Sequence, residues 1–154
     1  MKNKNFIKSL SHAFCGIKDA CREERNLRIH FAAGVMVCVF AAFYGLNKTE
    51  WAVLILTISA VITAELFNTG IERAVDTATD EIKESAKLAK DSAAGAVLCS
   101  AIGAAAVGVC LFGDIKKITY TLINIFTDVQ NSIFFAAVLA VCIGFLAFAG
   151  KRRK

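Results

Sequence analysis

Apolar residues fill four long stretches of the chain, and short polar segments separate them. Three stretches contain no Asp, Glu, Lys or Arg, and they cover residues 31–47, 92–113 and 132–150. Each approaches or reaches the ~20 residues that a helix needs to cross a bilayer. The fourth, from residue 51 to about residue 73, reaches that length only if it includes Glu65 and Glu72. The pattern predicts an all-α integral membrane protein with four transmembrane helices.

Two other segments have the spacing of amphipathic helices. Before the first span, apolar residues recur at three- and four-residue steps, at Phe6, Leu10, Phe14, Ile17 and Cys21. Most of the nearby Lys and Arg lie off that stripe, so we expect a helix in the membrane interface with its basic side toward anionic headgroups. Glu24 continues the apolar stripe and should therefore face the protein. A second interfacial helix is predicted within residues 114–131.

Composition agrees with a membrane protein, and the positive charges indicate its orientation. Hydrophobic residues make up 56% of the chain, and the mean hydropathy is +0.57. The basic amino end is not followed by a short apolar core with a cleavage site, so we expect no removable signal peptide. Fifteen Lys and Arg residues fall on one side of the four spans and three on the other. The positive-inside rule then predicts a multi-pass protein of the cytoplasmic membrane with both termini in the cytoplasm.

The third span has an unusually small surface. It is rich in Ala and Gly, and Gly95, Cys99 and Gly103 follow one another at steps of four. Small faces allow helix backbones to approach closely. We therefore expect this span to be central in the bundle.

Four polar residues share one face of the second span near its cytoplasmic end: Glu65, Asn68, Glu72 and Asp76. At about 100° per residue the other three stand within roughly 60° of Glu65 around the helix. At a rise of ~1.5 Å per residue the stripe extends about 16 Å, from inside the membrane to the cytosol. Ionised carboxylates in the membrane cost several kcal/mol each, so these groups need cations or take up protons.

Basic groups suited to phosphate lie on the same side. Lys87, Lys90 and Asp91 precede the third span, and Asp91 or Ser92 could cap a helix whose amino end favours anions. Carboxylates able to hold Mg²⁺, a lysine able to reach a phosphate and a deeper carboxylate able to accept a proton together indicate phosphoryl transfer at a lipid interface.

A structural explanation of the stripe is the first alternative. Glu65 and Asn68 could hydrogen-bond between helices, while Glu72 and Asp76 could mark the end of the span and pair with Arg73 or Lys87.

Two other classes of function also remain open. One is a small cation or proton transporter that uses Glu65 and Glu72 as sites within the membrane. The other is a membrane scaffold whose acidic stripe pairs with a partner protein.

The chain has no Walker A motif, kinase glycine loop or zinc pattern, so soluble kinase folds are excluded. His12 and His30 are isolated, and we interpret His30 as an anchor of the first span at the interface.

Three motifs resemble a known family, the small bacterial integral-membrane lipid kinases that comprise prokaryotic diacylglycerol kinase and undecaprenol kinase. They are "EERNLRIH" at residues 23–30, "ELFNTGIERAVD" at 65–76 and "AKDSAAGAV" at 89–97. The second motif has the family spacing of Glu, Asn, Glu and Asp. The likeness covers roughly residues 6–113, and the family's subunits are three-span chains with an amino-terminal surface helix.

The resemblance implies an ATP- and Mg²⁺-dependent kinase that phosphorylates a lipid hydroxyl. Glu24 and Glu72 correspond to the metal-binding carboxylates, and Glu65 corresponds to the catalytic base. Asn68 helps Glu65 to position the substrate.

Nucleotide contacts also follow from the resemblance. Lys90 corresponds to the γ-phosphate contact, and Asp91, Asp76 and Glu72 support nucleotide binding. Such relatives are homotrimers with active sites shared between subunits. We expect a lipid, ATP and further copies of the chain as partners, and no nucleic acid.

The motifs are more similar to the undecaprenol kinases than to the diacylglycerol kinases, so we expect undecaprenol as substrate, with diacylglycerol as the alternative. The chain departs from the family after residue 113. We therefore expect a lipid kinase domain at residues 1–113, followed at 114–154 by an external amphipathic segment, a fourth span and a basic cytoplasmic tail.

Overall fold

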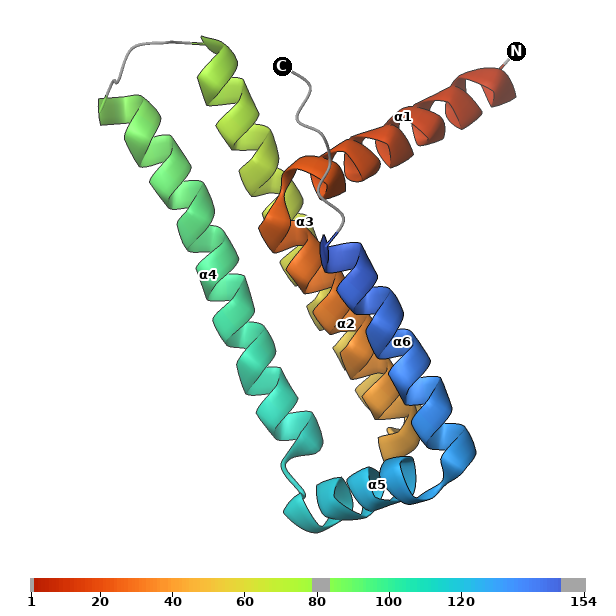
Figure 1. Ribbon diagram of the computed structural model, residues 1–154. Coiled ribbons are helices and arrows are strands. Elements are labelled where there is room, and N and C mark those ends of the chain that lie inside the picture. The colour runs from red at the N-terminus through yellow and green to blue at the C-terminus, as the bar shows by residue number, and fades with distance from the viewer. Residues whose placement is uncertain (1, 79–83, 148–154) are drawn as a thin grey trace.

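The computed structural model describes residues 2–78 and 84–147, which form six helices and no strand (Figure 1). The helices are α1 (Lys2–Glu23), α2 (Arg25–Tyr44), α3 (Lys48–Ala78), α4 (Glu84–Phe112), α5 (Ile115–Thr127) and α6 (Val129–Ala147). Four of them, α2, α3, α4 and α6, are long and apolar enough to cross a membrane. The prediction of an all-α membrane protein with four spans is confirmed, while the basic tail at residues 151–154 lies outside the described residues.

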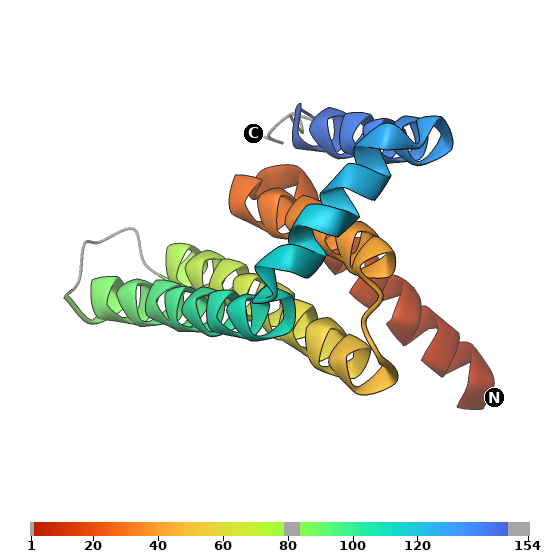
Figure 2. The same cartoon turned by 90° about the horizontal axis from the view of Figure 1, so that it is seen from below.

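Helix α2 is at the centre of the arrangement. It packs against α1, α3, α5 and α6, whereas α4 forms an antiparallel pair with α3 (Figure 1). Figure 2 shows α2 between α6 on one side and α3 on the other, with α5 crossing from the end of α4 to the start of α6. The part of the chain that follows α4 is therefore attached to the side of α2 that faces away from α3.

The prediction that the third span is central is wrong for the single chain. No residue in the most apolar part of α4 is fully buried, and Ala93 is the one buried residue of the whole helix. A Cβ added at Gly95 or Gly103 would meet nothing within 4 Å. A small helix face allows close approach, but it does not determine whether another helix of the same chain occupies it.

A tight turn fixes how α3 follows α2. Gly45 ends α2 in the left-handed conformation, with φ 74° and ψ 57°, and its N–H donates to the carbonyl of Ala41. Asn47 then caps α3, because its Oδ1 accepts from the backbone N–H groups of Thr49 and Glu50, at 2.9 and 3.0 Å. The Glu50 carboxylate accepts in return from the N–H of Asn47 at 2.7 Å, which completes a capping box. These bonds fix the register of α3 against α2.

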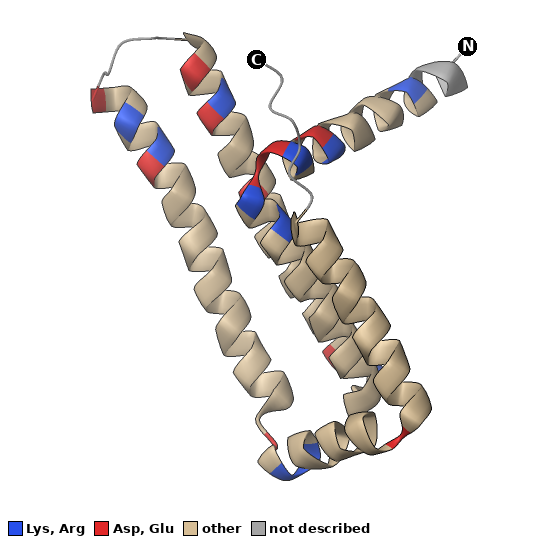
Figure 3. Ribbon diagram, viewed as in Figure 1, with Lys and Arg blue, Asp and Glu red and all other residues tan. Residues whose placement is uncertain are grey.

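Helix α1 leaves the bundle at a steep angle near the start of α2 (Figure 1). Its apolar side chains at Phe6, Leu10 and Phe14 are exposed in the isolated chain, as expected of a face that enters the membrane interface. Charged residues of α3, α4 and the α1–α2 junction gather at this same end of the molecule, other charged residues lie at the opposite end, and the middle of each span is almost uncharged (Figure 3). The predicted surface helix and the predicted charged end are therefore both present.

Close packing joins α2 to α3 in the middle of the membrane region. Gly34 is buried on α2, and a Cβ at this position would lie 3.0 Å from Cγ2 of Ile58 on α3. A side chain at this position would require the Ile58 side chain to shift, so the glycine allows the two helices to approach closely.

Replacing Gly34 with Leu should destabilise the protein by about 1–3 kcal/mol, the usual cost of overpacking a filled interface. Thermal unfolding in detergent should show a lower midpoint for Gly34→Leu than for the wild-type protein. Gly144→Leu on α6 is the matched control, since a Cβ there meets nothing within 4 Å. Equal midpoints for the two variants would contradict this account of the α2–α3 contact.

Candidate active site

The polar stripe predicted on the second span lies on one continuous helix, α3, and its exposure increases toward the charged end. Glu65 is buried at 4% exposure, Asn68 and Glu72 are half-buried, and Asp76 is exposed. Residues three and four apart on a helix are neighbours on its surface, which explains why the four side chains form one row. The stripe connects the apolar interior with the charged end of the molecule.

Glu65 contacts a side chain that the sequence analysis did not place at the site. Its Oε1 atom lies 3.1 Å from Nε2 of His30 on α2. The carboxylate is almost fully buried, with 5% of the side chain exposed, while 27% of the imidazole is exposed. The interpretation of His30 as a membrane anchor is therefore wrong, because the ring faces α3.

Glu24 lies at the junction between α1 and α2, half-buried as the apolar stripe predicted. It has extended backbone angles, and its carboxylate makes no cap bond to the start of α2. Arg28 holds the junction, since its Nη1 donates to the carbonyls of Cys21 and Arg22 at the end of α1, at 2.9 and 3.1 Å.

Asn68 and Glu72 form a pair of oxygen-rich side chains one turn apart. Nδ2 of Asn68 donates to Oε1 of Glu72 at 3.0 Å, while its Oδ1 is buried without a hydrogen-bond partner in the described structure. Buried polar atoms are nearly always satisfied, so an orphaned amide oxygen beside a carboxylate fits a ligand that is absent from the chain itself. Oxygen donors suit Mg²⁺, which proteins hold with one or two carboxylates plus substrate phosphates. The described residues contain no cluster of three or more His, Cys, Asp or Glu arranged for a metal.

The last residue of the stripe pairs with α4. Lys90 donates to Oδ1 of Asp76 across the α3–α4 contact. The suggested pairing of Asp76 with Arg73 or Lys87 is wrong, because Arg73 binds Glu23 at 2.8 Å instead.

Asp91 does not occupy the position that the sequence suggested. It is exposed, and α4 begins seven residues earlier, at Glu84. The prediction that Asp91 or Ser92 caps the third span is therefore wrong, and no helix amino end lies next to Lys90. The charged segment before the span continues the helix because its Lys, Ala and Leu residues are all good helix formers.

An apolar crevice of about 320 Å³ leads from the site into the membrane region. It lies between α2, α3 and α4 and extends from His30 past Gly34 and Ile58 to Phe112 near the other end of the spans. His30 is the one titratable residue among those that line it. A second hollow, lined by Asn68 and Phe67, lies between α3 and α4.

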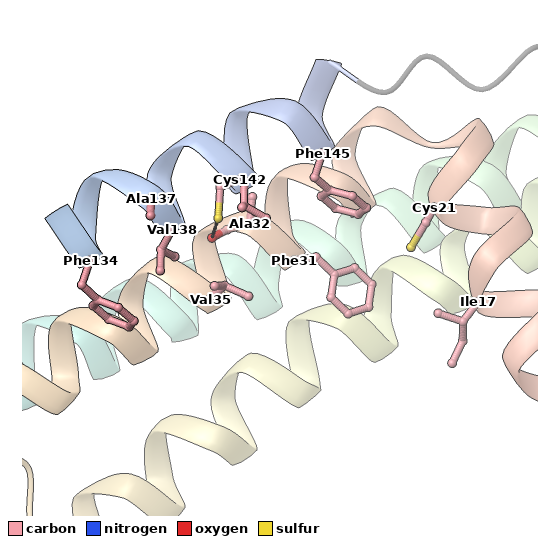
Figure 4. A pocket seen from close by; sticks show the side chains of 11 residues that line it. Ile17, Cys21, Phe31, Ala32, Val35, Phe134, Ala137, Val138, Cys142 and Phe145 are labelled. Atoms are coloured by element: carbon pink, nitrogen blue, oxygen red, sulfur yellow. Dashed lines mark hydrogen bonds between the residues drawn. The ribbon is translucent and has the colours of Figure 1, made fainter.

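Another cavity, of about 570 Å³, lies between α1, α2 and α6 (Figure 4). Its walls are apolar side chains and two thiols, and Figure 4 shows Phe31, Phe134 and Phe145 bordering it. The Cys142 thiol donates to the carbonyl of Ala32 at 3.9 Å. Burial raises the pKa of the other thiol, Cys21 on α1. This cavity contains no acid, base or phosphate-binding group, so it does not form part of the candidate active site.

The structure thus joins Glu65 to His30, Asn68 to Glu72 and Asp76 to Lys90. Glu24 lies at the junction of α1 and α2. His30 was the residue that sequence reasoning missed. One signal could have identified it: His30 lies near the charged end of α2, as Glu65 lies near the charged end of α3, so antiparallel packing brings them to similar depths.

Comparison with known proteins identifies a family. Residues 11–112 match the family described as "Prokaryotic diacylglycerol kinase". The chain is 40% identical over 107 residues to "Undecaprenol kinase" of Bacillus subtilis, covering 70% of this chain and 87% of that protein. It is 44% identical over 108 residues to "Diacylglycerol kinase" of Synechocystis, covering 70% of this chain and 62% of that protein. No solved structure shows significant similarity. The chain therefore belongs to the prokaryotic diacylglycerol kinase family of lipid kinases.

Proposed function

We propose that this protein transfers the γ-phosphate of ATP to the hydroxyl of undecaprenol at the cytoplasmic face of the membrane. The observation that carries the proposal is the position of Glu65. This carboxylate is buried on α3 beside His30, at the polar end of an apolar crevice, and Glu72 follows it two turns closer to the charged end. A lipid chain in the crevice and a nucleotide at the charged end would meet at this carboxylate.

Glu65 acts as the general base in this proposal. The hydroxyl O–H bond breaks as its proton passes to the Glu65 carboxylate, and the alcohol oxygen forms a bond to the γ-phosphorus. The bond between that phosphorus and the bridging oxygen breaks, and ADP leaves. A positioned base typically contributes about 10²- to 10⁴-fold to the rate.

Glu24 and Glu72 would hold Mg²⁺, with the free Oδ1 of Asn68 directed at the same region. When bound, the metal neutralises charge on the phosphates of ATP. The chain's own residues fit this task because Glu24 is free of cap bonds and Glu72 has no described cationic partner. Two carboxylates without cationic partners carry a high free-energy cost at the membrane, and a metal ion bound by both would lower it.

Lys90 would bind the γ-phosphate, and Asp76 would orient it. The two side chains form an ion pair across α3 and α4, and 35% of the Lys90 side chain is exposed. A lysine held by one carboxylate keeps two further N–H donors for phosphate oxygens. Asp91 is exposed on α4 next to this pair and would contact the nucleotide from there.

The choice of undecaprenol depends on the sequence motifs, in particular "ERNLRIH", which includes His30. Diacylglycerol is the alternative, and the 44% identity to the Synechocystis protein favours it. Both lipids present a hydroxyl at the membrane surface and hydrocarbon below it, which the apolar crevice can accommodate.

The orientation and assembly also belong to the proposal. The excess of Lys and Arg at the end where Glu72 and Lys90 lie supports a cytoplasmic site with both termini on that side. The exposed Ala- and Gly-rich face of α4 supports a homotrimer, because in the single chain nothing covers it.

Purified protein in mixed micelles should phosphorylate lipid with labelled ATP, and undecaprenol should give the higher kcat/KM when it is compared with diacylglycerol in the same micelles. The labelled product is measured after organic extraction. Faster phosphorylation of diacylglycerol would replace the proposed substrate with the alternative. Absence of labelled lipid with either substrate would contradict the function itself.

Glu72→Gln should lower kcat about 100-fold or more, a loss typical of removing one electrostatic stabiliser of a transition state. Glu24→Gln should act in the same direction, and both should raise the Mg²⁺ concentration for half-maximal activity. Glu23→Gln is the matched control, since Glu23 adjoins Glu24 but pairs with Arg73 on the exposed surface. An unchanged Mg²⁺ titration in Glu72→Gln would refute the metal assignment.

Lys90→Met should lower kcat/KM for ATP about 10- to 100-fold, the range expected for loss of a charge-assisted hydrogen bond. Lys87→Met, one turn earlier on α4 and exposed, should leave kcat/KM within about twofold because single surface charges contribute little. Steady-state kinetics with varied ATP would measure both. If the two variants behaved alike, Lys90 would not be the phosphate contact.

A further inference from the structure

We propose that His30 is the positioning residue of Glu65, because it donates a hydrogen bond that holds the carboxylate in place. The inference rests on the proposed function, in which Glu65 is the general base. Its geometric basis is the contact of 3.1 Å between Nε2 of His30 and Oε1 of Glu65, which joins α2 to α3. With 5% of its side chain exposed, Glu65 depends on protein groups for hydrogen bonds that water would otherwise provide.

The surroundings of Glu65 leave His30 as the donor. On α3, the Thr69 hydroxyl donates to the backbone carbonyl of Glu65 and therefore does not serve its carboxylate. Among the described contacts, His30 is the one side chain within hydrogen-bond distance of the Glu65 carboxylate. A buried carboxylate needs a donor from the protein, since water does not reach it.

Three cations at the same end of the molecule are engaged elsewhere. Arg28 donates to backbone carbonyls of α1, Arg73 pairs with Glu23, and Lys90 of α4 pairs with Asp76. These three side chains therefore have other partners, and the His30 imidazole is the group that contacts Glu65.

The contact also directs the chemistry of the carboxylate. When the N–H of Nε2 donates to Oε1, the Glu65 side chain is held in one rotamer and its second oxygen, Oε2, remains available for the lipid hydroxyl. Both the imidazolium and the neutral ring protonated at Nε2 can donate in this way. The hydroxyl proton forms its new bond to Glu65, and the proton on Nε2 stays on the imidazole throughout the step.

The position of the imidazole matches this task. His30 borders the apolar crevice, and 27% of its side chain is exposed. A hydroxyl that enters from the crevice therefore approaches Glu65 past His30. A histidine that served only to join two helices would have no need of this opening.

The test compares His30→Leu, His30→Gln and His30→Asn in the full-length protein, with labelled ATP and lipid in mixed micelles. His30→Leu should lower kcat about 10- to 100-fold, since a hydrogen bond to a buried charge is lost, while KM for ATP changes little. His30→Gln should recover most of the activity because its amide N–H can reach the carboxylate. Asn is one methylene shorter and should not rescue, which makes it the matched control.

A double-mutant cycle with Glu65→Gln separates positioning from a structural role. If His30 acts through Glu65, adding His30→Leu to the Glu65→Gln variant should cause no further loss of kcat. Independent, additive losses would overturn the proposal, and so would equal activities of His30→Leu and the wild type.

Should His30→Leu fail to assemble, the Gln and Asn variants carry the same comparison, and equal activity of these two would overturn it. A wild-type protein that phosphorylates no lipid would instead refute the proposed function, so the two failures are distinguishable.

Discussion

The free-energy cost of a carboxylate inside a membrane is the constraint on which this structure depends. Glu65 lies on an apolar span and is 4% exposed, so water cannot solvate it. Such a group persists only where the protein provides donors and where its charge has a use. The exposure gradient from Glu65 through Asn68 and Glu72 to Asp76 reflects the same cost, because each turn toward the charged end allows more solvent to reach the side chain.

Placing a donor at the depth of Glu65 requires a fixed register between two antiparallel helices. The Gly45 turn and the Asn47–Glu50 capping box determine where α3 begins, and Gly34 allows α3 to approach α2 closely. A shift of α3 by one residue would rotate Glu65 by about 100° and move it away from His30. The local signals of a three-residue turn at the opposite end of the spans thus control a contact within the candidate active site.

Features that depend on a single helix, such as its length and the residues that share one of its faces, could be predicted from the sequence. The spans follow from the lengths of uncharged stretches, and the acidic stripe follows from the spacing of residues 65, 68, 72 and 76. Contacts between helices could not be predicted, since they depend on distances and rotations that no single segment encodes. The His30–Glu65 and Lys90–Asp76 pairs are of this kind, and so is the peripheral place of α4. The start of α4 was also missed, because the charged residues before the span suggested a loop although they favour a helix.

Helices α5 and α6 lie outside residues 11–112, which match the family, and α6 packs on α2, away from the candidate site. Helix α5 crosses the end of the bundle opposite the charged residues, and α6 packs on the side of α2 that faces away from α3 (Figure 2). His30 faces α3, whereas Ala32 contacts α6, so the two sides of α2 have separate tasks. Helix α6 does not line the crevice at His30, and it leaves the small-residue face of α4 open. It forms one wall of the apolar cavity beside α1, and no residue of the polar stripe lines that cavity. Helix α2 thus lies between α6 and the contact of His30 with Glu65.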